Sequence, residues 1–443
     1  MKNGFKQRAL TSMLTVLAAL AGGSSMTWAG ETSLRPFLIV GEEFTDNVYE
    51  TSRNKQSDFI TRIRPGVNFR YLSPRIDWDS TYSIEYRHYA RNGHGDEFNH
   101  DAEMKSTITL IDNFFFVDLH DSYHRVSLDV TRDPLTQSSL FHNQTDENRA
   151  TISPYFLWRL GDKTTLKTGY RFTDVRYWGR GIERYEHGGF AELDYEMSSK
   201  LNINAGYTFT RLFSDEYNYN NHSVYGGFRY NYAENSFLFA QLGNTWQDFD
   251  TGRSTNYVFW NAGLVHDFNM LLLTLETRVQ NSSDPSGGIA GGGAYSYASI
   301  DPLHVSTKQT LYRVQIDKPI ERGMLSAYAS YTDYDYTDRP SKSCHKYLIG
   351  ASGRYELFPK LNVDASAFGE RTVGSDNSYY NYYYNDAYDY RLSGSLGMTY
   401  AFNYGLSVRL AYIYTTRRDD LGSSRNAANV NRGILELRKD FDF

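Results

Sequence analysis

Hydrophobic and polar residues alternate along most of this 443-residue chain, which places apolar side chains on one face of each segment. The segment 76–91 shows the pattern clearly. One of its faces is apolar and consists of Ile76, Trp78, Tyr82, Ile84 and Tyr86. The other face is charged and includes Asp77, Asp79, Glu85, Arg87 and Arg91. A period of two is typical of β-strands that contact an apolar medium on one side and water on the other.

The same alternation recurs along the chain, and the connections between the repeats are short and long in turn. Short turns such as Ser73-Pro74 and Glu234-Asn235 alternate with longer polar connections such as 129–146 and 282–304. The pattern predicts strands at 33–46, 57–72, 75–91, 97–110, 113–128, 147–160, 164–178, 184–197, 200–213, 220–233, 236–249, 255–267, 270–281, 305–318, 324–337, 344–357, 360–373, 387–402, 405–418 and 428–443.

These strands predict an all-β fold, a single closed antiparallel transmembrane β-barrel of the outer-membrane type with about 20 strands. Short periplasmic turns that alternate with longer outer loops are typical of such barrels. Lipid offers no hydrogen-bond partners to an open sheet edge, so the sheet must close. Barrels of about sixteen to eighteen strands already hold an aqueous channel, so this one is expected to enclose a water-filled passage. A soluble β-sandwich or β-helix array is the alternative, because a partner sheet can also bury an apolar face.

The last strand, Gly433–Phe443, alternates in the same way and ends on an aromatic residue. Leu435, Leu437 and Phe441 fall on its apolar face. A terminal aromatic on this face resembles the signal by which outer-membrane barrels are recognised for assembly. We therefore expect Phe441 and Phe443 to act as an assembly signal and the barrel assembly machinery to be a partner.

Residues 1–29 have the features of a secretory signal peptide, and 30–443 form the predicted barrel. Lys2, Lys6 and Arg8 precede the short apolar run 13–21, and Thr27-Trp28-Ala29 supplies small residues at positions −3 and −1 of a cleavage site. The expected location is the outer membrane of a Gram-negative cell, with outer-membrane lipid as a partner.

The composition restricts the partners and the forces that hold the fold. Without the leader, 43 Lys and Arg stand against 52 Asp and Glu, which argues against a nucleic-acid partner. Cys344 is the sole cysteine and cannot form an internal disulfide. Aromatic residues make up 16% of the chain, as expected for aromatic girdles on alternating strands.

The polar faces supply the first candidate site, the wall of the lumen. Arginines and acids on these faces either form cross-strand pairs on a wet wall or create a field that selects solutes. The dense cluster at 62–91 also suggests a cationic stripe for anionic solutes, which nearby acids oppose. The candidate lumen-lining residues are Arg62, Arg64, Arg70, Asp77, Asp79, Glu85, Arg87, Arg91, Arg391 and Arg409.

Tyrosine-rich connections supply a second candidate site. Tyrosine combines a flat apolar ring with a hydroxyl, which suits contact with sugar rings. Interface aromatics in a polar loop are the simpler interpretation. The glycine-rich loop 282–304 is expected either to fold into the lumen or to extend outside it. The segment 375–390 reads SDNSYYNYYYNDAYDY, and its candidate glycan-contacting residues are Tyr379, Tyr380, Tyr382, Tyr383 and Tyr384.

Recognisable catalytic motifs do not occur in the sequence. His120-Asp121-Ser122 contains the residue types of a hydrolase triad, but neighbouring strand residues point to opposite faces. We find no GxSxG, HExxH, Walker or CxxC motif. The sequence therefore predicts a protein that is not an enzyme and that carries no cofactor and no metal.

The runs Leu34–Thr51 and Phe59–Asn92 resemble a family of outer-membrane β-barrel porins. In that family an E-x-x-D-N-type segment ends the first strand, and an RPG strand and a charged alternating strand follow. The matching segments here are Glu43–Val48, Arg64-Pro65-Gly66 and Ile76–Arg91. Members of the family often occur with exopolysaccharide or exosortase-linked loci. The resemblance implies no catalytic residues.

The expected function is an outer-membrane channel for polar solutes, and the resemblance favours exopolysaccharide export. A polysaccharide and periplasmic export components would then be its partners. One alternative is a general or anion-preferring porin for small solutes. Another is an outer-membrane adhesion or scaffold protein whose Tyr-rich loops bind glycan.

Overall fold

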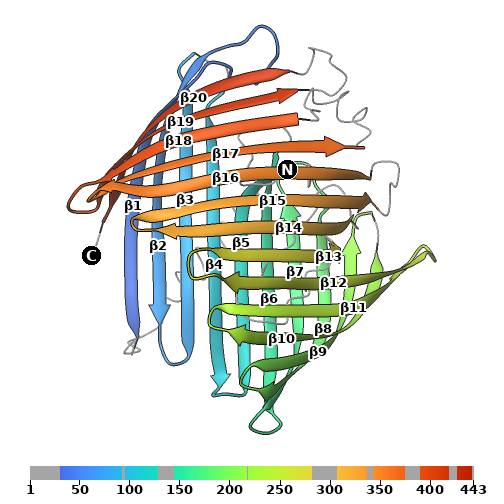
Figure 1. Cartoon of the computed structure of the whole chain (residues 1–443). Coiled ribbons are helices and arrows are strands. Elements are labelled where there is room, and N and C mark those ends of the chain that lie inside the picture. The colour runs from blue at the N-terminus through green and yellow to red at the C-terminus, as the bar shows by residue number, and fades with distance from the viewer. Residues whose placement is uncertain are drawn as a thin grey trace, which may run out of the picture.

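The computed structural model describes residues 30–91, 95–127, 144–216, 218–281, 307–336, 343–374, 390–418 and 427–441. These residues form one antiparallel sheet of 20 strands that closes into a barrel (Figure 1). The predicted signal peptide, the tyrosines at 379–384, the loop 282–304 and Phe443 lie outside the described residues. Within the described ranges, no helix is long and apolar enough to cross a membrane.

The chain forms its strands in order around the barrel. Figure 1 shows the early strands, in blue, behind the late strands, in orange and red. The first ten strands are β1 (Glu31–Thr45), β2 (Asp58–Leu72), β3 (Ile76–Tyr89), β4 (Glu97–Ile111), β5 (Phe115–Ser127), β6 (Gln144–Arg159), β7 (Thr164–Tyr177), β8 (Arg184–Ser198), β9 (Leu201–Ser214) and β10 (Tyr219–Ala233). The others are β11 (Ser236–Phe249), β12 (Ser254–Asp267), β13 (Leu272–Asn281), β14 (Thr307–Ile320), β15 (Gly323–Tyr336), β16 (Cys344–Phe358), β17 (Leu361–Val373), β18 (Tyr390–Ala401), β19 (Leu406–Arg418) and β20 (Ala428–Asp440).

Each strand pairs with the next along the chain, and β20 pairs with β1 to close the sheet. In this closing pair, Phe37–Thr45 run antiparallel to Arg432–Asp440. The predicted fold class is therefore confirmed, and the strand bounds differ from the predicted ones by a few residues. Asparagine supports three of the predicted short turns, because Asn113, Asn235 and Asn269 adopt positive φ angles of 59°, 52° and 65°. Asparagine tolerates this left-handed conformation better than most residues.

The two faces of the sheet differ as the alternation predicts. Large apolar side chains such as Leu242, Ile349 and Leu392 are exposed on the outer face, where lipid is expected. The inner face carries most of the paired charges and buried amides. Extensive contacts are confined to neighbouring strands, so the barrel encloses a space and is not a two-layer sandwich.

Accessibility of the inner face changes along the strands. In β8, Arg184, Glu186 and Phe190 are buried near the end that meets a long connection, whereas Asp194 and Glu196 are exposed near the short turn. The strands β1, β6, β10 and β14 show the same gradient. The interior is therefore tightly packed in its loop-side half and open in its turn-side half.

Candidate functional site

A cluster of buried charges covers the inner wall where the barrel closes. Arg62 on β2 lies between Glu43 on β1 and Glu85 on β3, with N–O distances of 3.3 and 3.0 Å. Arg432 on β20 lies 3.8 Å from Glu43 and donates a hydrogen bond of 2.6 Å to Glu50, which follows β1. The cluster therefore joins the first strands to the last one through paired charges.

The paired charges continue along the inner face from β3 to β6. Glu85 contacts Arg87 at 2.5 Å, and Arg87 contacts Glu97 at 3.3 Å. Arg125 then bridges Glu97 and Asp146, at 3.1 and 2.9 Å. Positive and negative side chains alternate along this path, so each cation is compensated by a neighbouring acid.

Compensated charges also line the inner face on the other side of the closure. Lys346 on β16 and Arg391 on β18 lie 3.0 and 3.7 Å from Glu370 on β17. Arg409 on β19 binds both oxygens of Asp364 on β17, at 2.7 and 2.9 Å. We call the inner face of β16–β20 and β1–β6 the charged wall.

Nine of the ten predicted lumen-lining residues lie on this inner face. Arg70 and Asp79 are exposed and stand opposite each other in the β2–β3 register, near the turn-side end. Arg64 keeps 34% of its side chain exposed and lies 3.9 Å from Glu85. The nine residues are Arg62, Arg64, Arg70, Asp77, Asp79, Glu85, Arg87, Arg391 and Arg409.

Arg91, the tenth predicted residue, does not lie on the inner face of the barrel. The strand β3 ends at Tyr89, so the alternation no longer determines where the Arg91 side chain points. Its backbone N–H donates to Asp58 at 2.9 Å, and its guanidinium lies 5.7 Å from the ring of Phe59, an outer-face residue. Arg91 therefore lies at the rim of the barrel and contacts the start of β2.

Exposure separates the arginines that should set ion selectivity from those that hold the wall together. We expect Arg64→Gln and Arg70→Gln to shift the reversal potential toward cations, because these side chains reach solvent. Arg62→Gln should lower the unfolding temperature more and the anion preference less, because Glu43 and Glu85 lose their buried partner. Reversal potentials across a KCl gradient and heat-modifiability gels measure both effects. A larger selectivity change in Arg62→Gln than in Arg70→Gln would contradict this assignment.

A second part of the inner face, on β9–β12, is nearly free of charge. Ser223 and Thr245 share a hydrogen bond of 2.8 Å, and Thr255 donates one of 3.2 Å to Gln247. This surface is not among the predicted sites, although the polar faces of these strands contain amides and hydroxyls with few charges. We call it the neutral wall and define it by Thr208, Thr210, Asn221, Ser223, Tyr225, Gln241, Thr245, Gln247 and Tyr257.

Some amide atoms of the neutral wall have unused hydrogen-bonding capacity. The Asn221 Oδ1 and Gln241 Nε2 atoms are buried and have no hydrogen-bond partner among the described residues. Both side chains belong to residues that are more than nine-tenths buried. Buried amide atoms are usually satisfied by protein, water or ligand, so the neutral wall is suited to contact with a hydroxylated solute.

The segment Glu43–Val48, which carries part of the family resemblance, closes the loop-side end of the barrel. The fully buried Asn47 donates to the carbonyls of Thr51 and Asn429 at 2.7 and 3.2 Å, and it accepts from the Thr51 N–H at 3.0 Å. Asp46 accepts two hydrogen bonds from Asn431, at 2.8 and 2.6 Å. These side chains attach the connection after β1 to β20.

Two acids that lie outside the strands, Asp96 and Asp250, stabilise the loop-side end of the barrel. Asp250 accepts hydrogen bonds of 2.7 and 2.6 Å from the Arg211 guanidinium, which lowers the pKa of Asp250. Asp96 accepts from the Tyr86 hydroxyl at 2.6 Å and contacts His88 at 2.9 Å, and the pKa of Asp96 is lowered for this reason. These contacts fasten connections and are not arranged for catalysis. No group of three potential metal ligands occurs among the described residues.

Phe441, one of the two predicted assembly residues, lies at the turn-side end of the closure. Its backbone N–H donates to the carbonyl of Pro36 at 2.9 Å, and the Lys439 ammonium lies 5.5 Å from its ring. Its position at the end of the β1–β20 pair is compatible with the predicted role in assembly, which stays a prediction.

Comparison with solved structures places the fold among outer-membrane barrels. A ferric enterobactin receptor mutant from Pseudomonas aeruginosa aligns over 92% of this chain and 80% of its own, with a TM-score of 0.52 and 10% identity. The FrpB iron transporter from Neisseria meningitidis aligns over 93% of this chain and 83% of its own, with a TM-score of 0.54 and 7% identity. At such low identity the similarity shows the fold alone. No family model and no curated protein matches the sequence.

The fold and the apolar outer face together give the cellular location. The chain is an integral β-barrel of the outer membrane, since a closed barrel with a lipid-compatible exterior is the architecture that spans this membrane. The short turns then face the periplasm and the longer connections face outward.

Proposed function

We propose that this barrel is an outer-membrane channel for polyhydroxylated solutes and that its substrate is an exported polysaccharide. The observation that carries the proposal is the neutral wall. Its amides and hydroxyls can exchange hydrogen bonds with sugar hydroxyls, and the half-buried ring of Tyr257 can contact a sugar ring, whereas Tyr225 is buried against Phe259 and Val279. The charged wall supports the same choice, because its cations are compensated and do not favour an anionic solute strongly.

The resemblance of 34–92 to porins that occur with exopolysaccharide loci also supports export. The gradient of packing is compatible with a solute that enters from the periplasm, since the turn-side half of the interior is open. The similar solved structures are named as iron transporters or iron-complex receptors. They do not support an iron complex as the substrate of this barrel, because their sequence identity to this chain is too low.

Planar-bilayer recordings and liposome swelling test the channel. We expect ion conductance from the folded full-length barrel, and entry of neutral oligosaccharides into liposomes. Gln241→Ala and Gln247→Ala should weaken the block of ion current by added oligosaccharides, whereas Glu196→Ala, on the opposite end of the neighbouring strand β8, should not. Two results would refute the polysaccharide assignment. One is that charged and neutral solutes block the ion current equally, and the other is that neither glutamine substitution changes the block by oligosaccharides.

A scaffold role is the second candidate, and one observation favours it. Inner-face side chains at the loop-side end are buried on many strands, for example Tyr89, Arg184 and Thr245. A lumen that is permanently filled at this end would pass no current. Absence of conductance from barrels that show normal heat-modifiability would reject the channel and favour the scaffold. Conductance without oligosaccharide entry would instead favour a porin for small solutes.

A further inference from the structure

A single row of side chains crosses the outer face of six neighbouring strands, β14–β19, near the loop side. Cross-strand partners follow one another directly along this row. Tyrosine at this height is typical of the girdle at a membrane interface, but two positions of the row are arginines. In strand order, the row consists of Tyr312, Tyr331, Tyr347, Arg371, Tyr390 and Arg418.

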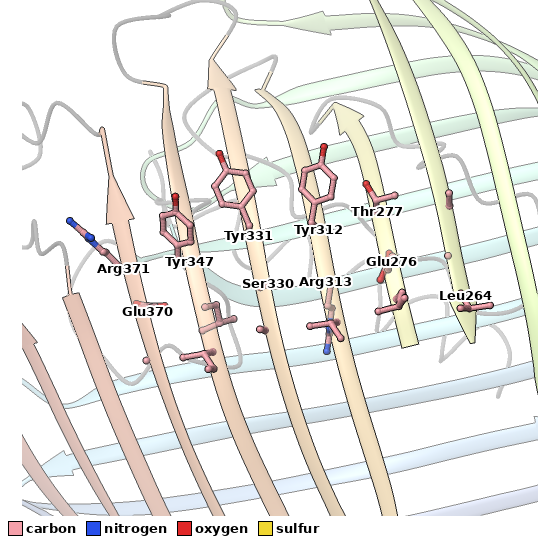
Figure 2. A pocket seen from close by; sticks show the side chains of 18 of the residues that line it. Leu264, Glu276, Thr277, Tyr312, Arg313, Ser330, Tyr331, Tyr347, Glu370 and Arg371 are labelled. Atoms are coloured by element: carbon pink, nitrogen blue, oxygen red, sulfur yellow. The ribbon is translucent and has the colours of Figure 1, made fainter. Parts of the chain in front are cut away.

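The geometry of the row holds its cations at the lipid surface. The rings of Tyr312, Tyr331 and Tyr347 lie side by side, with centroid distances of 6.2 and 5.2 Å, and Figure 2 shows Arg371 next to them. The Arg371 guanidinium lies 4.9 Å from the ring of Tyr390. A guanidinium is always charged in proteins, and stacking on an aromatic ring fixes its position.

An apolar groove lies directly below this row on the outer face. Its volume is about 1030 Å³, and a second hollow of about 710 Å³ continues it. Ile349 and Leu392 border both hollows and are 67% and 58% exposed. Small residues form much of the floor, and in two successive cross-strand rows these are Ala329 and Gly369, and then Ala327, Ala351, Ala367 and Gly394.

The groove lies within one leaflet of a bilayer. From Arg371 to Ala367 the strand β17 advances by four residues, or roughly 13 Å at about 3.3 Å per residue. A strand tilted by about 45° then covers roughly 9 Å of depth, less than half of a hydrocarbon core of about 30 Å. The groove therefore begins at a charged interface and ends within the outer leaflet.

We propose that this groove binds one anionic phosphorylated lipid of the outer leaflet, with its phosphate at Arg371 and Arg418 and its acyl chains on the small-residue floor. The two arginines supply charge-assisted donors at headgroup height, and the floor lets an acyl chain approach the backbone closely. A second copy of the barrel fits less well, because it would bury both arginines in an apolar contact.

Native mass spectrometry of the full-length protein in zwitterionic detergent tests the site. With added dimyristoyl phosphatidylglycerol we expect one retained lipid, and with dimyristoyl phosphatidylcholine much less retention. The double variant R371Q/R418Q should bind the anionic lipid about thirtyfold more weakly, since each cation near an anionic surface contributes about 1 kcal/mol. R176Q removes an outer arginine that is already paired with Asp174 and Glu183, so it should bind as the unmodified protein does.

Filling the groove provides an independent test that leaves the charges in place. A Cβ at Gly394 has its nearest heavy atom at 3.7 Å, so Gly394→Leu should fold and should displace the acyl chains. The matched control is Gly189→Leu, on the outer face of β8, where nothing lies within 4 Å of the added Cβ. Gly394→Leu should lower retention at least tenfold, and the control should not.

Three results would overturn the lipid assignment. Equal retention of the anionic and zwitterionic lipids would remove the role of the arginines. Unchanged retention in both R371Q/R418Q and Gly394→Leu would place the bound lipid elsewhere. A dimer that Gly394→Leu abolishes would show that a second copy occupies the groove.

Discussion

Replacing Glu50 with alanine is expected to lower the stability of the barrel by about 3–5 kcal/mol, the usual effect of removing one partner from a buried ion pair. The Glu50 side chain is 5% exposed and contacts both Arg432, at 2.6 Å, and Arg417, at 3.2 Å. Its backbone carbonyl also accepts from Arg417 at 2.8 Å. Without the carboxylate, two arginines of the last strands stay buried with too little compensating charge.

Urea unfolding in detergent micelles and heat-modifiability gels measure this loss of stability. Glu31→Ala is a suitable control, because Glu31 is exposed at the start of β1 and should change stability little. Glu50→Gln should recover part of the loss, since the amide oxygen still accepts a hydrogen bond. Equal stability of Glu50→Ala and Glu31→Ala would show that the cluster at the closure is hydrated and adds little.

The buried pair of Arg184 and Glu186 should respond in the opposite way. The Arg184 side chain is fully buried, and its nitrogens have no hydrogen-bond acceptor among the described residues. The Glu186 Oε1 atom lies 3.6 Å from the Arg184 Nε atom, which is too long for a strong bond. We expect the double variant R184M/E186L to be as stable as the unmodified protein or more stable by about 1–4 kcal/mol.

The single variant Glu186→Leu is the control for this experiment. It leaves Arg184 buried without its acid and should cost about 3–5 kcal/mol in the same urea titration. If the double variant is destabilised as much as the single one, water or a bound solute must satisfy the arginine. The result would then show that the loop-side half of the interior is wet.

The alternation of the sequence determined the fold because side-chain direction in a strand has a period of two residues. The segment 76–91 needed no further information to separate Ile76 and Trp78 from Asp77 and Asp79. Closure also followed from physics, since the edges at 33–46 and 428–443 have no other partner in lipid. The inward direction of most candidate arginines was therefore predictable, and Arg91 departed from it because the strand had ended.

The sequence alone does not predict which residues are neighbours across adjacent strands. Whether Arg62 meets Glu43, or Tyr347 meets Arg371, depends on the register between strands, and register depends on turn geometry and bulges as well as on alternation. The alternation alone therefore does not decide whether the arginines form a cationic stripe or compensated pairs. It does not predict the outer groove either, because the floor of the groove combines small residues from several strands.

The closing pair of strands has a consequence for the order of assembly. Every other pair in the described sheet joins strands that follow each other in the chain, so these pairs can form as local hairpins. The contact between Asn47 and Asn429 spans 382 positions, and it can form only after the last strand has been delivered. The first strand keeps an unpaired edge during this time. The rate at which the C-terminal strand arrives should therefore determine how long the nascent barrel is exposed to mispairing and proteolysis.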